Sequence, residues 1–517
     1  MNANDSSDDP LLMGVDAGLT NVKAAVFDTE GRERAVSVRP TPNERPQPGR
    51  VERNLSSFWD VTCETIREVL AEPTVQAEHI VGVGVSGHGH GLYALDEHGN
   101  PVRDGITSLD NRASEVVRSW NDSGRSEEMR AITGHEPFVA DPLSILGWIQ
   151  REEPEVYDAI DQLLFCKDYL KYRLTDVVCT DEMEASVFYD IDREGYSTRL
   201  FETLGLDDCA DALPPVVPSW DVCGEVTGEA AQATGLKPGT PVASGLHDVG
   251  AVALGSGAFK PGQGSLIVGT WGQSIYVSAS PGSGDHGGLS RRYLEDSWLQ
   301  YRGTRSAAAA VDWFTDECCR DWHDEASSDA AFYARLNEAV EQVPVGSNGL
   351  VFLPHLQGST DNPNERGSFV GLTIEHDRAD MLRSIYEGVS LSLSDRLLDL
   401  ASEGELSDVY LGGGGAKSAV WSQMFADILG EQVVAPTGEE AGARGVALCA
   451  GLAVGLYNDI ESAVEHVVGV ERRHDPDPSR SESYQAVHEA FRLAHDGTAS
   501  TWEKLKSLER EIQTNDY

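Results

Sequence analysis

The chain has 517 residues, which is longer than one ordinary hydrophobic core, so we expect two domains or more. Its 85 acidic residues outnumber 40 basic ones and give a formal net charge of −45, which argues against nucleic acid and anionic membranes as partners. Only 8 of the basic residues are Lys, and this composition is typical of a cytoplasmic protein from a salt-loving microbe. The alternative is an acidic enzyme from an organism of ordinary salinity.

The cysteines and the N-terminus indicate the same compartment. Eight Cys are scattered without C-x-x-C spacing, which favours buried free thiols over disulfides or structural zinc. The N-terminal MNANDSSDDP is acidic and polar, unlike a signal peptide, and we expect residues 1–10 to be disordered. The longest apolar stretch, 445–457, is too short to span a bilayer and predicts a buried helix. A cytoplasmic protein without a membrane partner is therefore predicted.

Strands alternate with helices through the first half of the chain. Residues 11–33 predict a strand, a glycine-containing turn and a second strand, and residues 53–72 predict a helix capped by Asn and Ser. Residues 79–100 predict two strands joined by a Gly/His loop, and residues 239–257 predict a strand, a loop and a helix. This alternation is typical of an α/β fold.

The opening pattern recurs at residues 264–280, again as a strand, a Gly-Thr-x-Gly turn and a strand. Two such hairpins suggest two related halves, although either one alone is also compatible with an ordinary β-turn. Turns with converging backbone N–H groups would hold the two sides of a phosphate chain. Farther on we predict a loop and strand at 351–372, an amphipathic helix at 378–402, a strand–glycine–helix–strand unit at 408–434, and helices at 441–457 and 483–496.

Asp248 is the only acidic residue between Glu229 and Asp285, although acids are frequent elsewhere in the chain. A carboxylate among Gly, Ala, Val and Leu is usually buried, and it must then be hydrogen-bonded, paired or functional. One interpretation makes Asp248 the N-cap of the helix that follows it. The other makes it a functional acid.

The glycine-rich LGGGGAKS at 411–418 fails both common nucleotide motifs. A Walker loop needs Gly immediately before Lys417, where this chain has Ala416, and a Rossmann fingerprint needs Gly at the position of Lys417. Four glycines between a strand and a helix still let a flat ligand lie against bare backbone. A tight contact between helix and sheet explains them equally well.

In order along the chain, these segments resemble the motifs of the FGGY family of carbohydrate kinases. GVDAGLTNVKAAVFD (14–28) and GTWG (269–272) resemble the two phosphate motifs, and GLHDVGA (245–251) resembles the segment that supplies the catalytic base. RGSFVGL (366–372) and YEGV (386–389) resemble the family signature, and GGGAKSAVWSQMFADILG (413–430) resembles the adenosine motif. No single motif is decisive, but their order is highly specific, and the resemblance covers about residues 12–495.

The resemblance implies an α/β fold of two ribonuclease-H-like domains with ATP in the cleft between them. It divides the chain into an N-terminal domain at 11–252, a C-terminal domain at 253–495 and a peripheral tail at 496–517. The implied reaction is ATP-dependent phosphorylation of a sugar hydroxyl, with Asp248 as the general base. A homodimer is an expectation at the level of the family.

The same resemblance implies roles for the other site residues. Asp16 would lie near Mg²⁺ and the phosphates. The phosphate turns would be lined by Thr20, Asn21, Lys23, Gly269, Thr270 and Gly272, and adenosine would pack against Gly414 and Gly415. Sugar contacts would come from His88, Gly89, His90, Asp110, Arg112, His247 and Asp248.

Departures from the family pattern bear on the sugar. Where xylulose kinases carry Gln-Met-His-Gly, this chain has His88, Gly89 and His90 before Gly91, and GLHDV replaces a Gly-Asp-Asn pattern. These features resemble the L-xylulose and tetritol kinases of the family, and Val249 removes one side-chain hydrogen bond to the sugar. We therefore expect a ketopentose or a related polyol. Glycerol is disfavoured because the Arg–Glu pair of glycerol kinase is missing.

Other interpretations stay open. Leu19 and Ala309 stand at nucleotide-side positions often held by other residues, so a sugar- or nucleotide-binding regulator that has lost its chemistry is the alternative function. His88, His90 and His247 could form a metal site, but no carboxylate or Cys joins them at ligand spacing. Asp110 and Arg112 could be ordinary polar-loop residues. An ATP-driven chaperone would need a peptide-binding domain, for which the residues after 495 leave no room.

Overall fold

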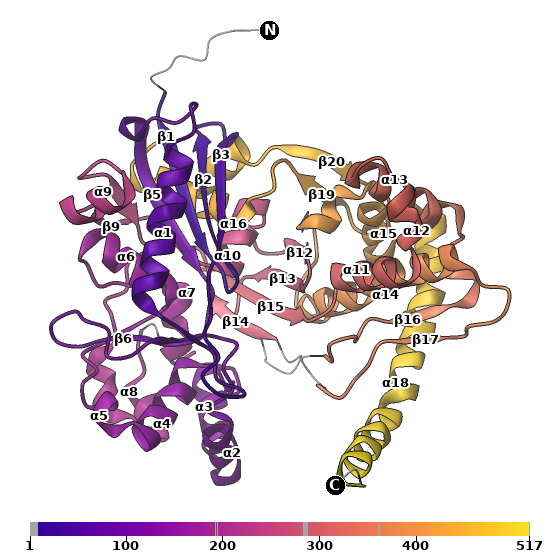
Figure 1. The fold of residues 1–517 in the computed structure, drawn as a ribbon, viewed down its shortest axis with the longest axis horizontal. Helices are drawn as coiled ribbons and strands as arrows, with labels where there is room; N and C mark the ends of the chain where they lie inside the picture. The colour runs from indigo at the N-terminus through magenta and orange to yellow at the C-terminus, as the bar shows by residue number, and fades with distance from the viewer. Residues whose placement is uncertain (1–8, 192, 194, 283–287, 360–361, 516–517) are drawn as a thin grey trace.

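Two mixed β-sheets, one from each half of the chain, form the framework of the molecule (Figure 1). The structure is a computed structural model that describes residues 9–191, 193, 195–282, 288–359 and 362–515. The predicted disorder of residues 1–10 falls almost wholly outside these ranges. The α/β class expected from the alternation of strands and helices is confirmed.

The first sheet has the strand order β3-β2-β1-β5-β10-β9, with β11 against the end of β5. The first three strands form an antiparallel meander, and β5 then lies parallel to β1. The carboxyl ends of β1, β5 and β11 therefore meet at one edge, where the first turn, the Gly/His loop and Asp248 come together. The strands are β1 (Leu11–Ala17), β2 (Asn21–Asp28), β3 (Glu33–Pro40), β5 (Ile80–Gly87), β9 (Val222–Glu225), β10 (Pro241–Ala243) and β11 (Leu246–His247).

The second sheet has the order β14-β15-β13-β12-β18-β19-β20. It repeats the plan of the first, because β12 and β13 form an antiparallel hairpin and β18 then lies parallel to β12. The two hairpins predicted from sequence thus hold equivalent places in two related halves. The strands are β12 (Gly264–Val268), β13 (Gly272–Ser278), β14 (Leu289–Arg292), β15 (Trp298–Thr304), β18 (Val409–Gly412), β19 (Val433–Pro436) and β20 (Val470–His474).

Helices of the first half form two groups. Helix α1 covers β2 and β3 with α9 beside it, whereas α2–α5 and α8 build a separate core below the sheet (Figure 1). The helices are α1 (Leu55–Leu70), α2 (Ser114–Ser123), α3 (Arg125–Thr133), α4 (Pro142–Glu152), α5 (Pro154–Tyr157), α6 (Cys166–Thr175), α7 (Glu182–Ala185), α8 (Thr198–Leu204), α9 (Gly228–Thr234) and α10 (Asp248–Ser256). The short strands here are β4 (Glu52–Arg53), β6 (Tyr93–Leu95), β7 (Gly105–Ile106) and β8 (Gln162–Leu164).

Helix α14 is the centre of the second half. Seventeen of its 23 residues are buried, so the helix predicted to be amphipathic is instead enclosed by β13, α11, α13 and α15. The helices are α11 (Ala308–Cys318), α12 (Arg320–Glu325), α13 (Asp329–Gln342), α14 (Arg378–Leu400), α15 (Ala419–Leu429), α16 (Ala441–Ala453), α17 (Ile460–Val467) and α18 (Pro478–Asn515), and the short strands are β16 (Val351–Leu353) and β17 (Ser368–Val370).

Helices α10 and α16 cross between the two sheets and join the halves (Figure 1). Helix α10 follows the first sheet but packs beside β18, whereas α16 follows the second sheet but covers β1 and β5. A Cβ on Gly255 would lie 1.9 Å from the Ala441 carbonyl oxygen, and one on Gly445 would lie 1.9 Å from that of Ala251. Only glycine permits so close a crossing, and one continuous hydrophobic core includes both helices and both sheets.

The predicted domain limits stay predictions, and the structure places both inside helices. The limit at 252/253 falls within α10, and the limit at 495/496 falls within α18, which continues unbroken to Asn515. Six of the eight Cys are buried, and all eight are free thiols. Within the described ranges, no helix combines the length and apolar character that crossing a membrane requires.

Candidate active site

The turn between β1 and β2 is held from beneath by a wholly buried arginine. Arg53 Nη2 donates to the carbonyl oxygens of Gly18 and Leu19 at 3.2 and 2.9 Å, and Asn43 Nδ2 donates to the Leu19 carbonyl at 2.6 Å. In a trans peptide the next N–H points opposite to the carbonyl. The N–H groups of Leu19 and Thr20 therefore face away from Arg53, which supports a backbone role for this turn despite the apolar side chain at Leu19.

The predicted residues of this turn lie together. Thr20 is exposed, and Asn21 Nδ2 donates to its hydroxyl at 3.3 Å. The Lys23 ammonium lies 2.8 Å from a carboxylate oxygen of Glu440, just before α16, so the turn is linked to the second half of the chain. A lysine half-buried beside one carboxylate can exchange that partner for a phosphate.

The turn between β12 and β13 is built in the same way. Ala308 N donates to the Gly269 carbonyl at 2.8 Å, and Ala307 N donates to the Thr270 carbonyl at 3.2 Å, which ties the turn to the start of α11. Thr270 is exposed, and Gly272 is buried at the start of β13. A Cβ on Gly272 would lie 2.8 Å from Leu393 Cδ2, so this glycine is required by packing.

The glycines that follow β18 divide into two kinds. A Cβ on Gly413 would lie 2.7 Å from the Val268 carbonyl oxygen, and one on Gly415 would lie 2.5 Å from Val268 Cγ1. Gly413 and Gly415 therefore permit a tight backbone contact, which was one of the two interpretations of this glycine run. Gly414 is exposed, and a Cβ added to it would meet no atom within 4 Å, so its face is open to a flat ligand.

Asp248 is the first residue of α10, and one third of its side chain (33%) is exposed. Its Oδ1 accepts from Val249 N at 2.7 Å and lies 3.0 Å from His247 Nδ1. Burial acts to raise the pKa of Asp248, but the charge and the hydrogen bond of His247, together with the Val249 N–H, hold it below its usual value. The side chain is therefore a carboxylate at neutral pH. The N-cap interpretation is wrong, because the N-cap is His247.

Asp16, the last residue but one of β1, pairs with Ser86 of β5, whose hydroxyl donates to Asp16 Oδ1 at 2.6 Å. Burial raises the pKa of Asp16 to about 6, and the nearby charge of Asp248 adds to this rise, while the Ser86 hydrogen bond and Lys23 oppose it. A cation bound near both carboxylates would offset this repulsion. Oxygen donors of this kind fit the Mg²⁺ that the family resemblance implies beside Asp16.

A small pocket is lined by His247, the residue that precedes Asp248. Its volume is about 10 Å³, room for no more than one water. Arg291 and Tyr301 of its wall come from the second half of the chain and the others from the first, so both halves contribute to this pocket. The lining residues are His90, Pro142, Phe165, Glu184, Val187, His247, Arg291 and Tyr301.

The His247 imidazole fills the space that a side chain at position 89 would need. A Cβ on Gly89 would lie 1.6 Å from His247 Nε2, so a side chain at position 89 excludes this placement of the imidazole. The absence of a side chain at Gly89 and the position of His247 therefore depend on each other. His90, with a φ of 56°, turns its Nδ1 to within 2.8 Å of Asp141 Oδ1 and lines the pocket.

We expect Gly89→Ala to lower kcat/KM for the sugar by about 10²-fold, because the methyl group must displace His247 and with it the partner of Asp248. The KM for ATP should stay unchanged. Steady-state kinetics check both values. Gly228→Ala is the matched control, because no atom lies within 4 Å of the added Cβ. Unchanged sugar kinetics in Gly89→Ala would show that His247 does not position the reactants.

Five predicted sugar residues do not line this pocket: Gly89, Asp248, His88, Asp110 and Arg112. His88 is buried, with Nε2 3.0 Å from the Tyr93 hydroxyl, and burial lowers its pKa to about 3, so it is neutral. Asp110 and Arg112 form a buried ion pair through Oδ2 and Nη2 at 2.8 Å, and Asp110 Oδ2 also accepts from Val51 N at 2.6 Å. Arg112 further contacts Glu52. These contacts hold both side chains in place, whereas the buried Arg112 Nη1 has no hydrogen-bond partner among the described residues. A sugar contact of the pair stays a prediction.

Sequence reasoning missed Glu184, Arg291 and Tyr301. Glu184 is one of 85 acids and lies among other acids in TDEMEAS, so nothing in the sequence distinguishes it from a surface residue. In the fold it is buried, and burial raises its pKa to about 8. This rise favours the protonated form of Glu184, which can donate a hydrogen bond inside the pocket.

We expect Glu184→Gln to gain stability relative to the parent chain as pH rises from 4.5 to about 8. Above that range the difference in free energy of unfolding between the two proteins should stay constant. In this window the unfolded parent has released the Glu184 proton while the folded parent retains it, so the parent loses stability as pH rises. Gln carries no such proton. Thermal unfolding of both proteins across this window tests the expectation, and a constant gap would contradict it.

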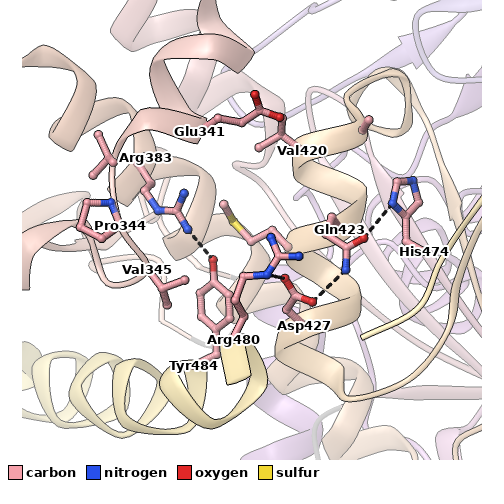
Figure 2. A pocket seen from close by; sticks show the side chains of 13 residues that line it. Glu341, Pro344, Val345, Arg383, Val420, Gln423, Asp427, His474, Arg480 and Tyr484 are labelled. Atoms are coloured by element: carbon pink, nitrogen blue, oxygen red, sulfur yellow. Dashed lines mark hydrogen bonds and ion pairs between the residues drawn. The ribbon is translucent and has the colours of Figure 1, made fainter. Parts of the chain in front are cut away.

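A larger cavity of about 500 Å³ lies against α15, beyond the glycine turn (Figure 2). Its polar walls pair with one another. Arg383 Nη2 donates to the Tyr484 hydroxyl at 3.0 Å, and Arg480 Nε lies 3.1 Å from Asp427 Oδ2. Gly414 and Gly415 do not line it, although five of its lining residues belong to the segment 413–430 that resembles the adenosine motif.

The sequence matches two family profiles in order. Residues 11–255 match the N-terminal domain of the FGGY family of carbohydrate kinases, and residues 264–454 match the C-terminal domain of that family. The chain belongs to this family. It is therefore a sugar kinase, an enzyme that uses ATP as its co-substrate.

Curated relatives and a solved structure that resemble this chain are also named as sugar kinases. The chain is 34% identical over 486 residues to the L-xylulose/3-keto-L-gulonate kinase of Escherichia coli, covering 93% of this chain and 95% of that protein. It is 27% identical to the xylulose kinase of Bacillus subtilis, with 96% and 99% covered. The crystal structure of xylulose kinase from Rhodospirillum rubrum superposes with a TM-score of 0.84 at 27% identity, covering 95% of this chain and all of that one (100%).

Proposed function

We propose that this FGGY kinase phosphorylates a hydroxyl of a ketopentose of the xylulose type, with L-xylulose as the first candidate. The observation that carries the proposal is Asp248, an ionised and partly exposed carboxylate held by His247, which lines the small pocket. The joint replacement at Gly89 and His247 supports a sugar other than that of D-xylulose kinases. Two relatives named as L-xylulose kinases, at 34% and 31% identity, point the same way.

In the proposed mechanism, Asp248 accepts the proton of the attacking hydroxyl. Both of its hydrogen-bond contacts use Oδ1, and among the described residues no hydrogen bond reaches Oδ2, which leaves that oxygen for the sugar. Sugar hydroxyls are weakly acidic, so a positioned base assists their attack in phosphoryl transfer. When bound near Asp16, Mg²⁺ would offset charge on the phosphates.

The chain's own groups would position the phosphates and keep water out. Backbone N–H groups of the two turns, at Leu19–Thr20 and Thr270, would hold the phosphate chain from both sides, and Lys23 would contribute a positive charge. The pocket walls drawn from both halves would close over the sugar and prevent transfer to water. Gly414 would present bare backbone to the adenosine.

A sugar acid is the second candidate substrate. Arg291 lines the pocket and is nearly wholly buried, and a guanidinium recognises a carboxylate with paired hydrogen bonds. The name of the Escherichia coli relative includes 3-keto-L-gulonate, a sugar acid.

The test is ADP release from Mg-ATP in molar KCl with a panel of acceptors: D-xylulose, L-xylulose, D-ribulose, L-ribulose, erythritol, xylitol, glycerol and 3-keto-L-gulonate. We expect L-xylulose or 3-keto-L-gulonate to give the highest kcat/KM. A clear preference for D-xylulose would overturn the assignment of the sugar. Stimulation by none of them, with ATP still bound, would favour the non-catalytic regulator.

A further inference from the structure

Two histidines and a glutamate converge in the second half of the chain, away from Asp248. His355 follows β16, Glu365 precedes β17 and His495 lies on α18. One side-chain ligand atom from each lies within 4.8 Å of the others, and no other three metal-ligating side chains of the described ranges converge in this way. In Figure 1 these elements lie at the lower right, apart from α10 at the centre.

The spacing of the donor atoms is close to that of a metal site. His495 Nε2 lies 3.2 Å from Glu365 Oε1, and His355 Nδ1 lies 3.7 Å from Glu365 Oε2. Zinc binds imidazole nitrogen and carboxylate oxygen at about 2.0–2.2 Å in a tetrahedron, which separates its donors by roughly 3.4 Å. Small side-chain rotations would therefore bring all three onto one ion.

Burial supplies a second, independent observation. Glu365 is only 8% exposed, and its Oε2 has no hydrogen-bond partner among the described residues although it is buried. A buried carboxylate oxygen without a donor is costly, and a cation would satisfy it.

The surroundings favour a cation over an anion. A cavity of about 370 Å³ opens beside the three residues and leaves room for water as a further ligand. Its lining has three Arg and four carboxylates, so it is acidic even with neutral histidines. Two of the arginines already pair, Arg302 with Asp399 and Arg492 with Asp395.

We propose that His355, Glu365 and His495 bind a divalent transition-metal ion of the zinc class. Imidazole ligands select zinc, cobalt or nickel, whereas Mg²⁺ takes oxygen ligands, so this ion is distinct from the Mg²⁺ expected at Asp16. The site also lies on the other face of the second sheet. Tyr301 of β15 lines the sugar pocket while its neighbour Arg302 lines this cavity, and successive strand residues point to opposite faces. The ion would join α18 to the segment between β16 and β17.

The test is a titration of the full chain, without a histidine tag and with Cys318→Ser to remove an exposed thiol. The protein is stripped with chelator, returned to KCl with millimolar Mg²⁺, and titrated with ZnCl₂ by calorimetry and with CoCl₂ by visible absorption. We expect one equivalent of each ion and the absorption of a low-coordinate Co²⁺ site. His355→Ala, His495→Ala and Glu365→Gln should each weaken binding by at least about tenfold.

His488→Ala is the matched control, because His488 lies on the same helix and contacts Asp395 rather than Glu365. It should keep the parent affinity. Equal loss in His488→Ala and His495→Ala, retained affinity in the three ligand variants, or no stoichiometric binding would each overturn the proposal.

Thermal unfolding separates a metal site from a merely packed cluster. Zinc should raise Tm in the parent and in His488→Ala but not in Glu365→Gln, since a ligand stabilises only the state that binds it. If zinc shifts Tm equally in all three, the triad is a structural cluster and the proposal is wrong. Circular dichroism confirms that each variant is folded.

Discussion

Asp248→Asn should lower sugar-dependent ADP release by about 10²- to 10⁴-fold while ATP binds as tightly as before. The amide keeps the size of the carboxylate. Its oxygen can still accept from Val249 N, which donates to Asp248 at 2.7 Å in the parent protein. It cannot accept the proton of the attacking hydroxyl at neutral pH. Steady-state kinetics with the preferred sugar and calorimetry with ATP measure the two quantities.

The control for this variant is Asp221→Asn, the same chemical change at an exposed position. It should leave both quantities unchanged. Turnover in Asp248→Asn close to that of the parent would remove Asp248 from the mechanism. A parallel loss of ATP binding would instead show that Asp248 acts through the structure of the cleft rather than as a base.

Gly445→Ala should destabilise the protein by about 1–3 kcal/mol or more, the range expected for overpacking. The added Cβ would lie 1.9 Å from the Ala251 carbonyl oxygen, so α10 and α16 would have to move apart. Because Asp248 begins α10, sugar kinase activity should fall as well. The midpoint of urea unfolding and the specific activity measure these effects.

Gly228→Ala again provides the control, because the added Cβ at that position meets no atom within 4 Å. It should leave stability unchanged or raise it slightly, since alanine restricts the unfolded chain. An unfolding midpoint in Gly445→Ala equal to that of the control would show that the two helices can separate at little cost. The crossing would then not be what holds the two halves together.

The parts of the site that sequence predicted are those that neighbouring residues build. The turns at 18–21 and 269–272 and the glycines at 413–415 lie in the predicted strand–turn–strand and strand–glycine–helix units. Their residue types follow from local backbone geometry, so they are visible without the fold. Asp248 was visible for another reason, because it is isolated in a long window free of other acids.

The parts that sequence could not predict depend on contacts between distant segments. Glu184 is distinguished from the other acids only by burial beside His247, which shifts its pKa. Asp110 and Arg112 are suited to contact a sugar by type, but they pair with each other and with the backbone of Val51. The approach of His355, Glu365 and His495 joins residues from three separate segments.

The sequence by itself therefore determined the family, the α/β class and the order of the motifs, because local patterns of glycine, apolar residues and turns indicate them. Only the tertiary structure decided which polar side chains face the pocket and how the halves join. Whether a carboxylate is a surface charge, half of an ion pair or a protonated donor depends on its burial and on its partners. Those are set by residues far away in the chain, as the crossing of α10 and α16 shows.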